Sequence, residues 1–211
     1  MSRGKFITLE GGEGVGKSTA MAAIADELSQ ADIAFVQTRE PGGTPLGEEL
    51  RGVLLTPRDD TVSADAELLL MFAARAEHIA KVIEPALSAG TWVVSDRFTD
   101  ASYAYQGGGR GIEDSRIDSI ERWVQSGLQP DLTLLFDASI ELSRERLKRR
   151  AASDRIENEN NEFFEKVRRA YLMRAQAFPD RFRMIDASQS LQGVDRDVRQ
   201  QVQHVMAAAT E

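Results

Sequence analysis

The sequence predicts an α/β fold of three layers, in which a five-stranded, mostly parallel sheet lies between helices. Short apolar runs, each next to a turn or a polar cluster, are expected to form the strands: Phe6–Leu9, Ala34–Thr38, Trp92–Ser95, Leu132–Asp137 and Phe182–Ile185. Longer segments with helical spacing lie between or after these runs: Lys17–Ser29, Ala64–Leu87, Glu113–Val124, Ser139–Arg150, Phe163–Ala177 and Val194–Ala208. Alternating strands and helices indicate βαβ units, whose parallel sheet is covered on both faces.

The chain is expected to form a single domain, residues 1–211. Its 211 residues fit one domain, and no repeat, low-complexity tract or linker divides them. The segments without a strand or helix pattern are Glu40–Gly43, Thr56–Ser63, Gln106–Gly111 and Ala151–Asn161. The economical interpretation is one domain with a mobile insertion. Separately, Gln106–Gly111 lacks a G-K-[ST] ending and is interpreted as a flexible loop.

Composition excludes several classes of function. The net charge of −8 argues against a general binder of nucleic acids or membrane surfaces, because both require a basic face. The absence of cysteine excludes disulfides, zinc fingers and thiol nucleophiles. No signal-peptide pattern is present, and no stretch approaches the roughly 18 apolar residues of a membrane span. We therefore expect a cytoplasmic protein that holds any anionic ligand at a local basic site.

A phosphate-binding loop follows the first predicted strand. The run Gly11-Gly-Glu-Gly-Val-Gly16-Lys17-Ser18 matches G-x-x-x-x-G-K-[ST] between a strand and a helix. A glycine-rich turn capped by serine is the alternative, and this context disfavours it. Glycines let backbone N–H groups surround phosphate oxygens, and the following helix adds its positive end. Lys17 is expected to bridge the β- and γ-phosphates, and the Ser18 hydroxyl to ligate Mg²⁺.

The loop predicts a P-loop NTPase-type fold that binds a nucleoside triphosphate. The residues expected around the phosphates are Gly11, Gly12, Glu13, Gly14, Val15, Gly16, Lys17, Ser18 and Thr19. GTPases would also show a D-x-x-G and an N-K-x-D element, and neither occurs in the chain. That weighs against a signalling switch.

Charged residues follow two strands at their carboxyl ends, where α/β sheets bind ligands. Asp96 is placed to hold a water of the Mg²⁺ shell, and Arg97 to clamp a phosphate with two hydrogen bonds. Arg39 ends the second strand on the same rim. Two arginines beside the loop predict a second anion site, although each alone could be a solvated surface residue. Asp137 is interpreted as structural, because Ser139 follows it as a helix cap.

A basic cluster precedes the last helices of the chain. It contains Arg144, Arg146, Lys148, Arg149, Arg150 and, after a short polar break, Arg155. Such a run is either a solvated face or a lid that closes on the triphosphate. Guanidinium groups stabilise the charge of a transferring phosphoryl group, and lids exclude water. Beside the phosphate-binding loop, we interpret residues 144–160 as a small mobile lid.

These motifs together resemble the bacterial thymidylate kinases of the nucleoside-monophosphate kinase superfamily. The resemblance runs from Phe6 to about Ser188. It rests on the E-G-x-E-G-x-G-K-S-T loop at 10–19, Thr-Arg-Glu-Pro-Gly-Gly-Thr at 38–44, Asp96-Arg97, Ala104-Tyr105-Gln106-Gly107 and Asp154-Arg155. It implies transfer of the γ-phosphoryl of ATP to dTMP, with Mg²⁺ as cofactor, in dTTP biosynthesis. It also implies a homodimer, for which helix surface on 64–87 or 113–124 could serve.

The resemblance implies roles for residues at the acceptor nucleotide. Glu13 would bind the deoxyribose 3′-hydroxyl, and Arg97 with Arg39 would hold the dTMP phosphate. Tyr105 would pack under the sugar and disfavour a 2′-hydroxyl. Arg51 is a further contact candidate.

Roles at the thymine base are implied in the same way. Arg75 would hydrogen-bond the base, and Ser102 and Gln106 would read its edge. The family usually has an aromatic residue four positions before this arginine, where this chain has Met71. Either the Phe72 ring stacks on the base or Met71 replaces it as a soft contact. Without the resemblance, Arg75 would fit a core helix with one snorkelling arginine.

The resemblance also places the catalytic arginine. Because the loop has Gly14 and Val15 and no arginine, the family type with a lid arginine is implied, with Arg150 and Arg155 as donors and Arg146 less favoured. The residues expected to take part in catalysis are Lys17, Arg97, Arg150, Arg155 and Glu13. Asp186-Ala187-Ser188 resembles the adenine-side loop. The two histidines, His78 and His204, have no partner pattern and are predicted at the surface.

Two alternatives remain open. One is a kinase for another small acceptor, such as dUMP, AMP or a shikimate-like alcohol. The other is a nucleotide-binding regulatory module without phosphoryl transfer.

Overall fold

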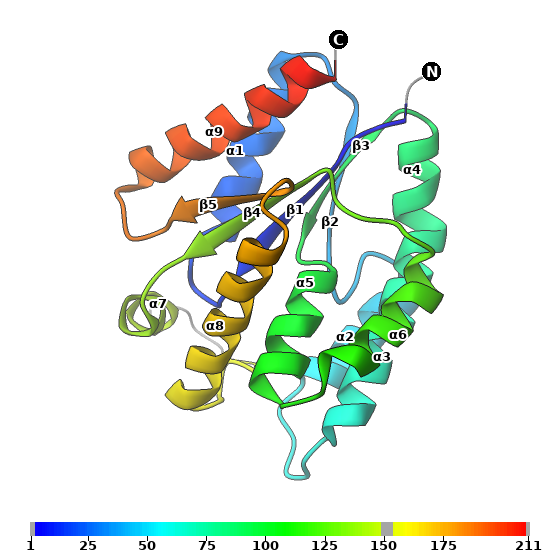
Figure 1. Ribbon diagram of the computed structural model, residues 1–211, viewed down its shortest axis with the longest axis vertical. Helices are drawn as coiled ribbons and strands as arrows, with labels where there is room; N and C mark the ends of the chain where they lie inside the picture. Colours follow the sequence, from blue (N-terminus) through cyan, green and yellow to red (C-terminus); the bar gives the residue numbers. More distant parts are fainter. Residues whose placement is uncertain (1–2, 149–153, 210–211) are drawn as a thin grey trace.

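The computed structural model describes residues 3–148 and 154–209, and it confirms the predicted α/β class (Figure 1). Within these residues, the strands of the five-stranded sheet are β1 (Phe6–Gly11), β2 (Phe35–Arg39), β3 (Trp92–Asp96), β4 (Leu132–Asp137) and β5 (Phe182–Asp186). They lie in the order β2-β3-β1-β4-β5, and every neighbouring pair is parallel. The register pairs Leu9 with Asp96 and Gly11 with Phe136, so the carboxyl ends of three strands meet at one edge.

Helices cover both faces of this sheet. Within the described residues they are α1 (Lys17–Gln30), α2 (Pro45–Leu55), α3 (Ala64–His78), η1 (Ile79–Ile83, π-helical), α4 (Glu84–Ser88), α5 (Thr99–Ser102), η2 (Tyr103–Gly109, π-helical), α6 (Asp114–Gln125), α7 (Ile140–Leu147), α8 (Asn161–Ala177) and α9 (Leu191–Ala208). Helices α1 and α9 pack together on one face, while α5 and α8 lie on the other (Figure 1). In this described part of the chain, no helix combines the length and hydropathy needed to cross a bilayer.

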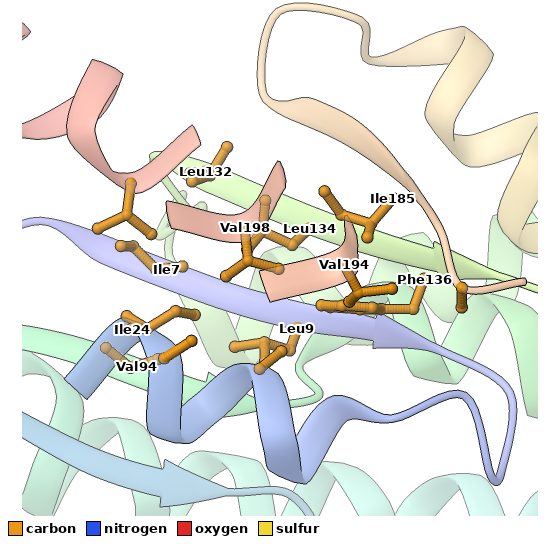
Figure 2. Close-up of a cluster of buried hydrophobic side chains, with 14 of the residues drawn as sticks. Ile7, Leu9, Ile24, Val94, Leu132, Leu134, Phe136, Ile185, Val194 and Val198 are labelled. Atoms are coloured by element: carbon orange, nitrogen blue, oxygen red, sulfur yellow. The ribbon is translucent and has the colours of Figure 1, made fainter. Parts of the chain in front are cut away.

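The largest hydrophobic core lies between the sheet and the helices α1 and α9. Side chains alternate along β1, so Ile7 and Leu9 point toward this core while Thr8 points to the opposite face. Figure 2 shows Ile7 and Leu9 beside Ile24 of α1 and Val198 of α9. Full burial of such a side chain contributes about 1.5–3 kcal/mol to stability. This core therefore holds α1 and α9 firmly against the sheet, and the loop between β1 and α1 leaves the sheet at its carboxyl edge.

The elements agree with the sequence pattern in most places. The long helical pattern at 64–87 is realised as α3, η1 and α4 in succession. Ser139 caps α7 by accepting a hydrogen bond from the N–H of Leu142 at 3.3 Å, as expected. The helix α2 was not predicted. It begins at Pro45 after Thr44, whose hydroxyl accepts a hydrogen bond from the N–H of Gly47 at 3.0 Å.

The prediction that Gln106–Gly111 is a flexible loop is wrong. Residues up to Gly109 belong to the π-helical segment η2, and Gln106 is buried there. The glycines serve close packing against α8, because a Cβ at Gly108 would lie only 2.7 Å from the Cβ of Ala170. The glycine run therefore allows η2 and α8 to approach each other.

Candidate active site

The predicted phosphate loop joins β1 to α1. Gly14 and Gly16 have φ values of 71° and 97°, which glycine adopts without the steric cost of a side chain. A Cβ at Gly14 would also lie 2.6 Å from the carbonyl oxygen of Ser143, so α7 packs directly on the loop. The loop thus has the backbone conformation and the helix N-terminus that bind phosphate groups.

Lys17 folds back across this loop. Its Nζ donates hydrogen bonds to the carbonyl oxygens of Gly11 at 3.3 Å and Gly12 at 2.9 Å. Burial and the charge of Arg97 lower the pKa of the Lys17 ammonium group, while nearby carboxylates oppose that shift. The ammonium group is therefore held over the loop, where it can meet a phosphate oxygen.

Arg97 connects this loop to the rest of the site. Its backbone has a φ of 73°, which is rare for a residue with a side chain. The Ser95 hydroxyl donates a hydrogen bond to the Arg97 carbonyl oxygen at 2.7 Å, and the Arg97 N–H donates to the carbonyl oxygen of Leu9 at 2.9 Å. These two bonds hold the strained turn that directs the side chain toward the loop.

The guanidinium group of Arg97 is shared by several partners. It donates to the Gly11 carbonyl oxygen at 2.6 Å and to Glu13 Oε1 at 2.5 Å. It also donates to the hydroxyl oxygens of Tyr105 at 3.0 Å and Tyr171 at 3.2 Å. A planar group with several donors can hold this arrangement while a lysine cannot.

Glu13 is ionised in this arrangement. Burial alone would raise its pKa, but the charges of Arg97 and Lys17 and the hydroxyl of Tyr105 lower it to about 2. A lowered carboxyl pKa stabilises the fold above the unfolded value of 4.5, and this contribution is lost as the pH falls toward 2. Glu13 therefore presents a carboxylate at neutral pH.

Glu10, three residues earlier in β1, has the opposite shift in pKa. Its two carboxyl oxygens accept hydrogen bonds from the N–H of Phe98 and from the hydroxyl of Tyr171, both at 2.7 Å. Burial and the charge of Asp100 raise its pKa to about 8, against the smaller influence of Arg97. The folded protein thus favours the protonated form of Glu10.

This shift predicts a pH dependence of stability. Between pH 4.5 and 8 the folded state binds the proton that the unfolded state has released. The free energy of unfolding should fall as the pH rises through this window, by up to about 1.4 kcal/mol per pH unit. Glu10→Gln should remove that slope. Urea unfolding of both proteins across the window measures it, and parallel curves would show that Glu10 is ionised.

Asp96 offers a place for the predicted metal. Its Oδ1 is buried and has no hydrogen-bond partner among the described residues. A buried carboxylate oxygen without a partner is costly, and a hydrated cation would satisfy it. Ser18 stands in the first turn of α1, as the motif predicts. These oxygens fit Mg²⁺, which prefers oxygen ligands and keeps several waters.

A cavity of about 60 Å³ lies beside Arg97, away from the phosphate loop. Its lining comprises Glu40, Pro41, Arg51, Leu55, Met71, Arg75, Arg97, Phe98, Ala101, Ser102, Tyr105, Gln106 and Ile156. Seven of the residues predicted at the acceptor nucleotide are in this lining: Arg51, Met71, Arg75, Arg97, Ser102, Tyr105 and Gln106. Residues from four separate parts of the sequence therefore converge as the family resemblance implies.

Arg75 is held rigidly at this cavity. Its Nε donates to Glu40 Oε2 at 2.7 Å, and its Nη1 donates to the Ser102 hydroxyl at 3.0 Å. A third bond, 3.1 Å long, joins Nη2 to the carbonyl oxygen of Phe98. The guanidinium carbon also lies 4.5 Å from the centroid of the Phe72 ring. Arg75 is 3% exposed and ion-paired, so it does not snorkel to solvent.

The two candidates for base stacking have different places. Met71 lines the cavity, whereas Phe72 is buried in a cluster with Leu68 and Tyr103. Phe72 supports the guanidinium group of Arg75 from behind. This placement favours Met71 as the side chain that a ligand in the cavity would touch.

The prediction that His78 lies at the surface is wrong, although His204 is exposed as predicted. His78 is fully buried, with Nδ1 2.9 Å from Glu40 Oε1 and Nε2 2.6 Å from the Thr38 hydroxyl. It follows Arg75 by three positions and therefore lies on the same face of α3. Both side chains meet Glu40, which fixes α3 to the end of β2.

The remaining predicted phosphate contact, Arg39, is more exposed. It forms an ion pair with Glu48 at 2.8 Å and does not line the cavity. Asp137 forms a two-bond ion pair with Arg168, at 2.6 and 2.8 Å, as a structural residue would.

The predicted lid arginines are distributed over different surroundings. Arg144 lines a cavity of about 330 Å³ between the phosphate loop, α7 and α8. Arg146 donates to the carbonyl oxygen of Ala187 at 3.0 Å, beside the predicted adenine-side loop. Arg155 donates to Glu67 Oε2 at 2.6 Å and to the carbonyl oxygen of Leu54 at 2.7 Å. Arg150 lies outside the described residues.

Some side chains of the site were not predicted. Glu10 and Glu40 lie within the quoted motifs, and Glu67 precedes Met71 and Arg75 at helical spacing, so the pattern contained a signal for each. Tyr171 had no local signal, because its partners Glu10 and Arg97 are far away in sequence.

Comparison with known proteins agrees with this geometry. The family model described as thymidylate kinase matches residues 9–198. A thymidylate kinase of Cupriavidus pinatubonensis is 58% identical over 194 residues, covering 91% of this chain and 94% of the relative. One of Pseudomonas putida strain GB-1 is 55% identical over 195 residues, covering 92% and 93%. The crystal structure of thymidylate kinase from Ehrlichia chaffeensis, 32% identical, superposes with a TM-score of 0.77 and covers 95% of this chain and 99% of that one. The matches cover nearly the whole chain, and Arg97 contacts both the phosphate loop and the cavity. The chain therefore belongs to the thymidylate kinase family.

Proposed function

We propose that the protein transfers the γ-phosphoryl group of ATP to dTMP and releases dTDP and ADP. The observation that carries the proposal is the position of Arg97. It lines the acceptor cavity and also donates hydrogen bonds to Gly11 and Glu13 of the phosphate loop. The Arg97 guanidinium group therefore lies between the phosphate loop and the cavity proposed for the second nucleotide, as a direct transfer requires.

The reaction needs no covalent intermediate. An oxygen of the dTMP phosphate attacks the γ-phosphorus, and the bond from that phosphorus to the β–γ bridging oxygen breaks. A general base is not required, because the second pKa of a phosphate monoester is about 6. The chain contributes positioning and charge neutralisation by Lys17 and Arg97.

Mg²⁺, held through Ser18 and the free oxygen of Asp96, would neutralise charge on the β- and γ-phosphates. A lid arginine is the further predicted source of positive charge at the transferring group. Arg150 and Arg155 remain the candidates for it.

Contacts at the acceptor are proposed from the lining of the cavity and from Glu13 and Arg39, which lie outside that lining. Tyr105 would pack against the sugar, and Glu13 would accept a hydrogen bond from the 3′-hydroxyl. Arg75 would donate to a base carbonyl oxygen, with Ser102 and Gln106 at the same edge. Arg51, and Arg39 after it leaves Glu48, would meet the phosphate.

The test measures the release of ADP with a coupled assay, in the presence and in the absence of dTMP. We expect release that depends on both dTMP and Mg²⁺. Measuring kcat/KM for dTMP, dUMP and AMP identifies the acceptor, and a preference for AMP would contradict the base-site assignment. Binding of ATP with no dTMP-dependent turnover would instead support a regulatory module.

We also propose a homodimer. Leu69 on α3 and Trp123 on α6 are large apolar side chains that are 59% and 82% exposed, and their helices pack together. A solution mass of twice 23.3 kDa is expected. A cytoplasmic location stays a prediction.

A further inference from the structure

Glu67 is a buried carboxylate outside the roles described so far. It belongs to α3, and its side chain is 1% exposed. It accepts hydrogen bonds from three side chains of different segments: Gln106 of η2 at 2.9 Å, Arg155 at 2.6 Å, and Arg110 at 3.2 Å to each oxygen. Such convergence on one carboxylate indicates more than a surface ion pair.

The two arginines keep Glu67 ionised. Burial would raise the pKa of Glu67, but hydrogen bonds from Arg110, Gln106 and Arg155 lower it. An ionised carboxylate has no proton and can only accept hydrogen bonds. Any amide that contacts it must therefore present its NH₂ group.

This restriction determines the orientation of the Gln106 amide. Its Nε2 donates to Glu67 Oε1, so the Gln106 carbonyl oxygen occupies the other branch of the amide. Gln106 is 1% exposed and lines the acceptor cavity. The amide thus presents its carbonyl oxygen, a hydrogen-bond acceptor, on the branch that does not contact Glu67.

We propose that Glu67 is a positioning residue that determines base specificity, by fixing Gln106 as a hydrogen-bond acceptor for a pyrimidine with an N3–H group. The inference rests on the proposed function of the cavity as the site of dTMP. Thymine has a donor at N3 between two carbonyl oxygens, so it matches the Gln106 acceptor and the Arg75 donors. Cytosine has an unprotonated N3 and an amino group at position 4, so both hydrogen bonds would face a like partner. Arg155, which belongs to the predicted lid, donates a hydrogen bond to Glu67 and helps to keep it ionised.

The test is the isosteric variant Glu67→Gln, assayed with dTMP and dCMP at saturating ATP. A glutamine at 67 can donate or accept, so the Gln106 amide can turn over. We expect the ratio of kcat/KM for dTMP to that for dCMP to fall roughly tenfold, the size of one lost hydrogen-bond preference. The KM for ATP should stay within about twofold. A purely structural role would reduce the active fraction for both acceptors equally and leave the ratio unchanged.

Further variants complete the experiment. Glu159→Gln removes the outer partner of Arg110, a 2.5 Å ion pair, without touching Gln106, and should keep the wild-type ratio. In a Gln106→Leu background, Glu67→Gln should change the ratio no further, because both act through one contact. If Glu67→Gln folds poorly beside the two partly buried arginines, the double variant Glu67→Gln/Arg155→Met removes a charge of each sign together. The ratio of kcat/KM for dTMP to that for dCMP remains informative in this double variant. If the loss of Arg155 slows phosphoryl transfer, it slows transfer to both acceptors.

The outcomes separate the two claims. A wild-type protein without dTMP-dependent ADP release overturns the proposed function. An active wild type, with a Glu67→Gln variant that keeps the full preference for dTMP over dCMP, overturns only the inference about Glu67.

Discussion

Lys17→Ala should lower kcat by about 10³-fold or more and leave no useful turnover. The Lys17 ammonium group lies over the carbonyl oxygens of Gly11 and Gly12, where the β- and γ-phosphates are expected. Removing one preorganised charge that stabilises a transition state typically costs 10²–10³ in rate. We expect a larger loss here because the same lysine also holds the phosphate loop through its carbonyl oxygens. The assay is ADP release at saturating ATP and dTMP.

The matched control is Lys81→Ala. Lys81 is an exposed residue that pairs with Glu77 on the outside of the η1 region, and its loss should change kcat by less than about twofold. Circular dichroism and thermal unfolding of the Lys17 variant establish that it is folded. A folded Lys17→Ala protein with the wild-type rate would reject the mechanism.

Arg97→Lys should lower kcat/KM for dTMP by about 10²–10³-fold. Lysine preserves the charge, but it cannot reach Gly11, Glu13 and the two tyrosine hydroxyls at once. The acceptor phosphate would lose a two-bond clamp, and Glu13 would lose its strongest partner. The KM for ATP should change by less than about threefold, since Lys17 and the loop backbone remain. Initial rates with each substrate varied in turn give both constants.

The control for this variant is Arg196→Lys, an exchange of the same chemistry in an exposed ion pair with Asp197 on α9. It should behave as the wild type. Equal losses for dTMP and ATP in Arg97→Lys would show a general disturbance of the site, and would contradict the assignment of Arg97 to the acceptor.

The fold could be predicted because its signals are local. Each strand is a short apolar run, and a helix N-cap residue such as Ser139 predicts the helix that follows it. The loop at 11–18 was recognised for the same reason, since its glycines, lysine and serine occupy fixed offsets. The helix α2 was missed because its 11 residues include two glycines, Gly47 and Gly52, which weaken a helical pattern.

The partners of the site residues could be predicted less well. Arg75 was predicted to contact a ligand, but its ion pair with Glu40 was not predicted, because the two residues are 35 positions apart in the sequence. His78 was assigned to the surface because a histidine alone shows no periodic signal, and its burial depends on β2 lying beside α3. Such contacts arise from tertiary packing, which a single sequence does not display.

The close approach of η2 to α8 has a mechanical consequence. Gly108 leaves no room for even a methyl group against Ala170, so these two segments have no slack between them. Helix α8 follows residues 144–160, the segment predicted to be a lid, and η2 carries Tyr105 and Gln106. We therefore expect a tilt of α8 to move η2 as well, and with it the wall of the cavity that we propose for the sugar and base.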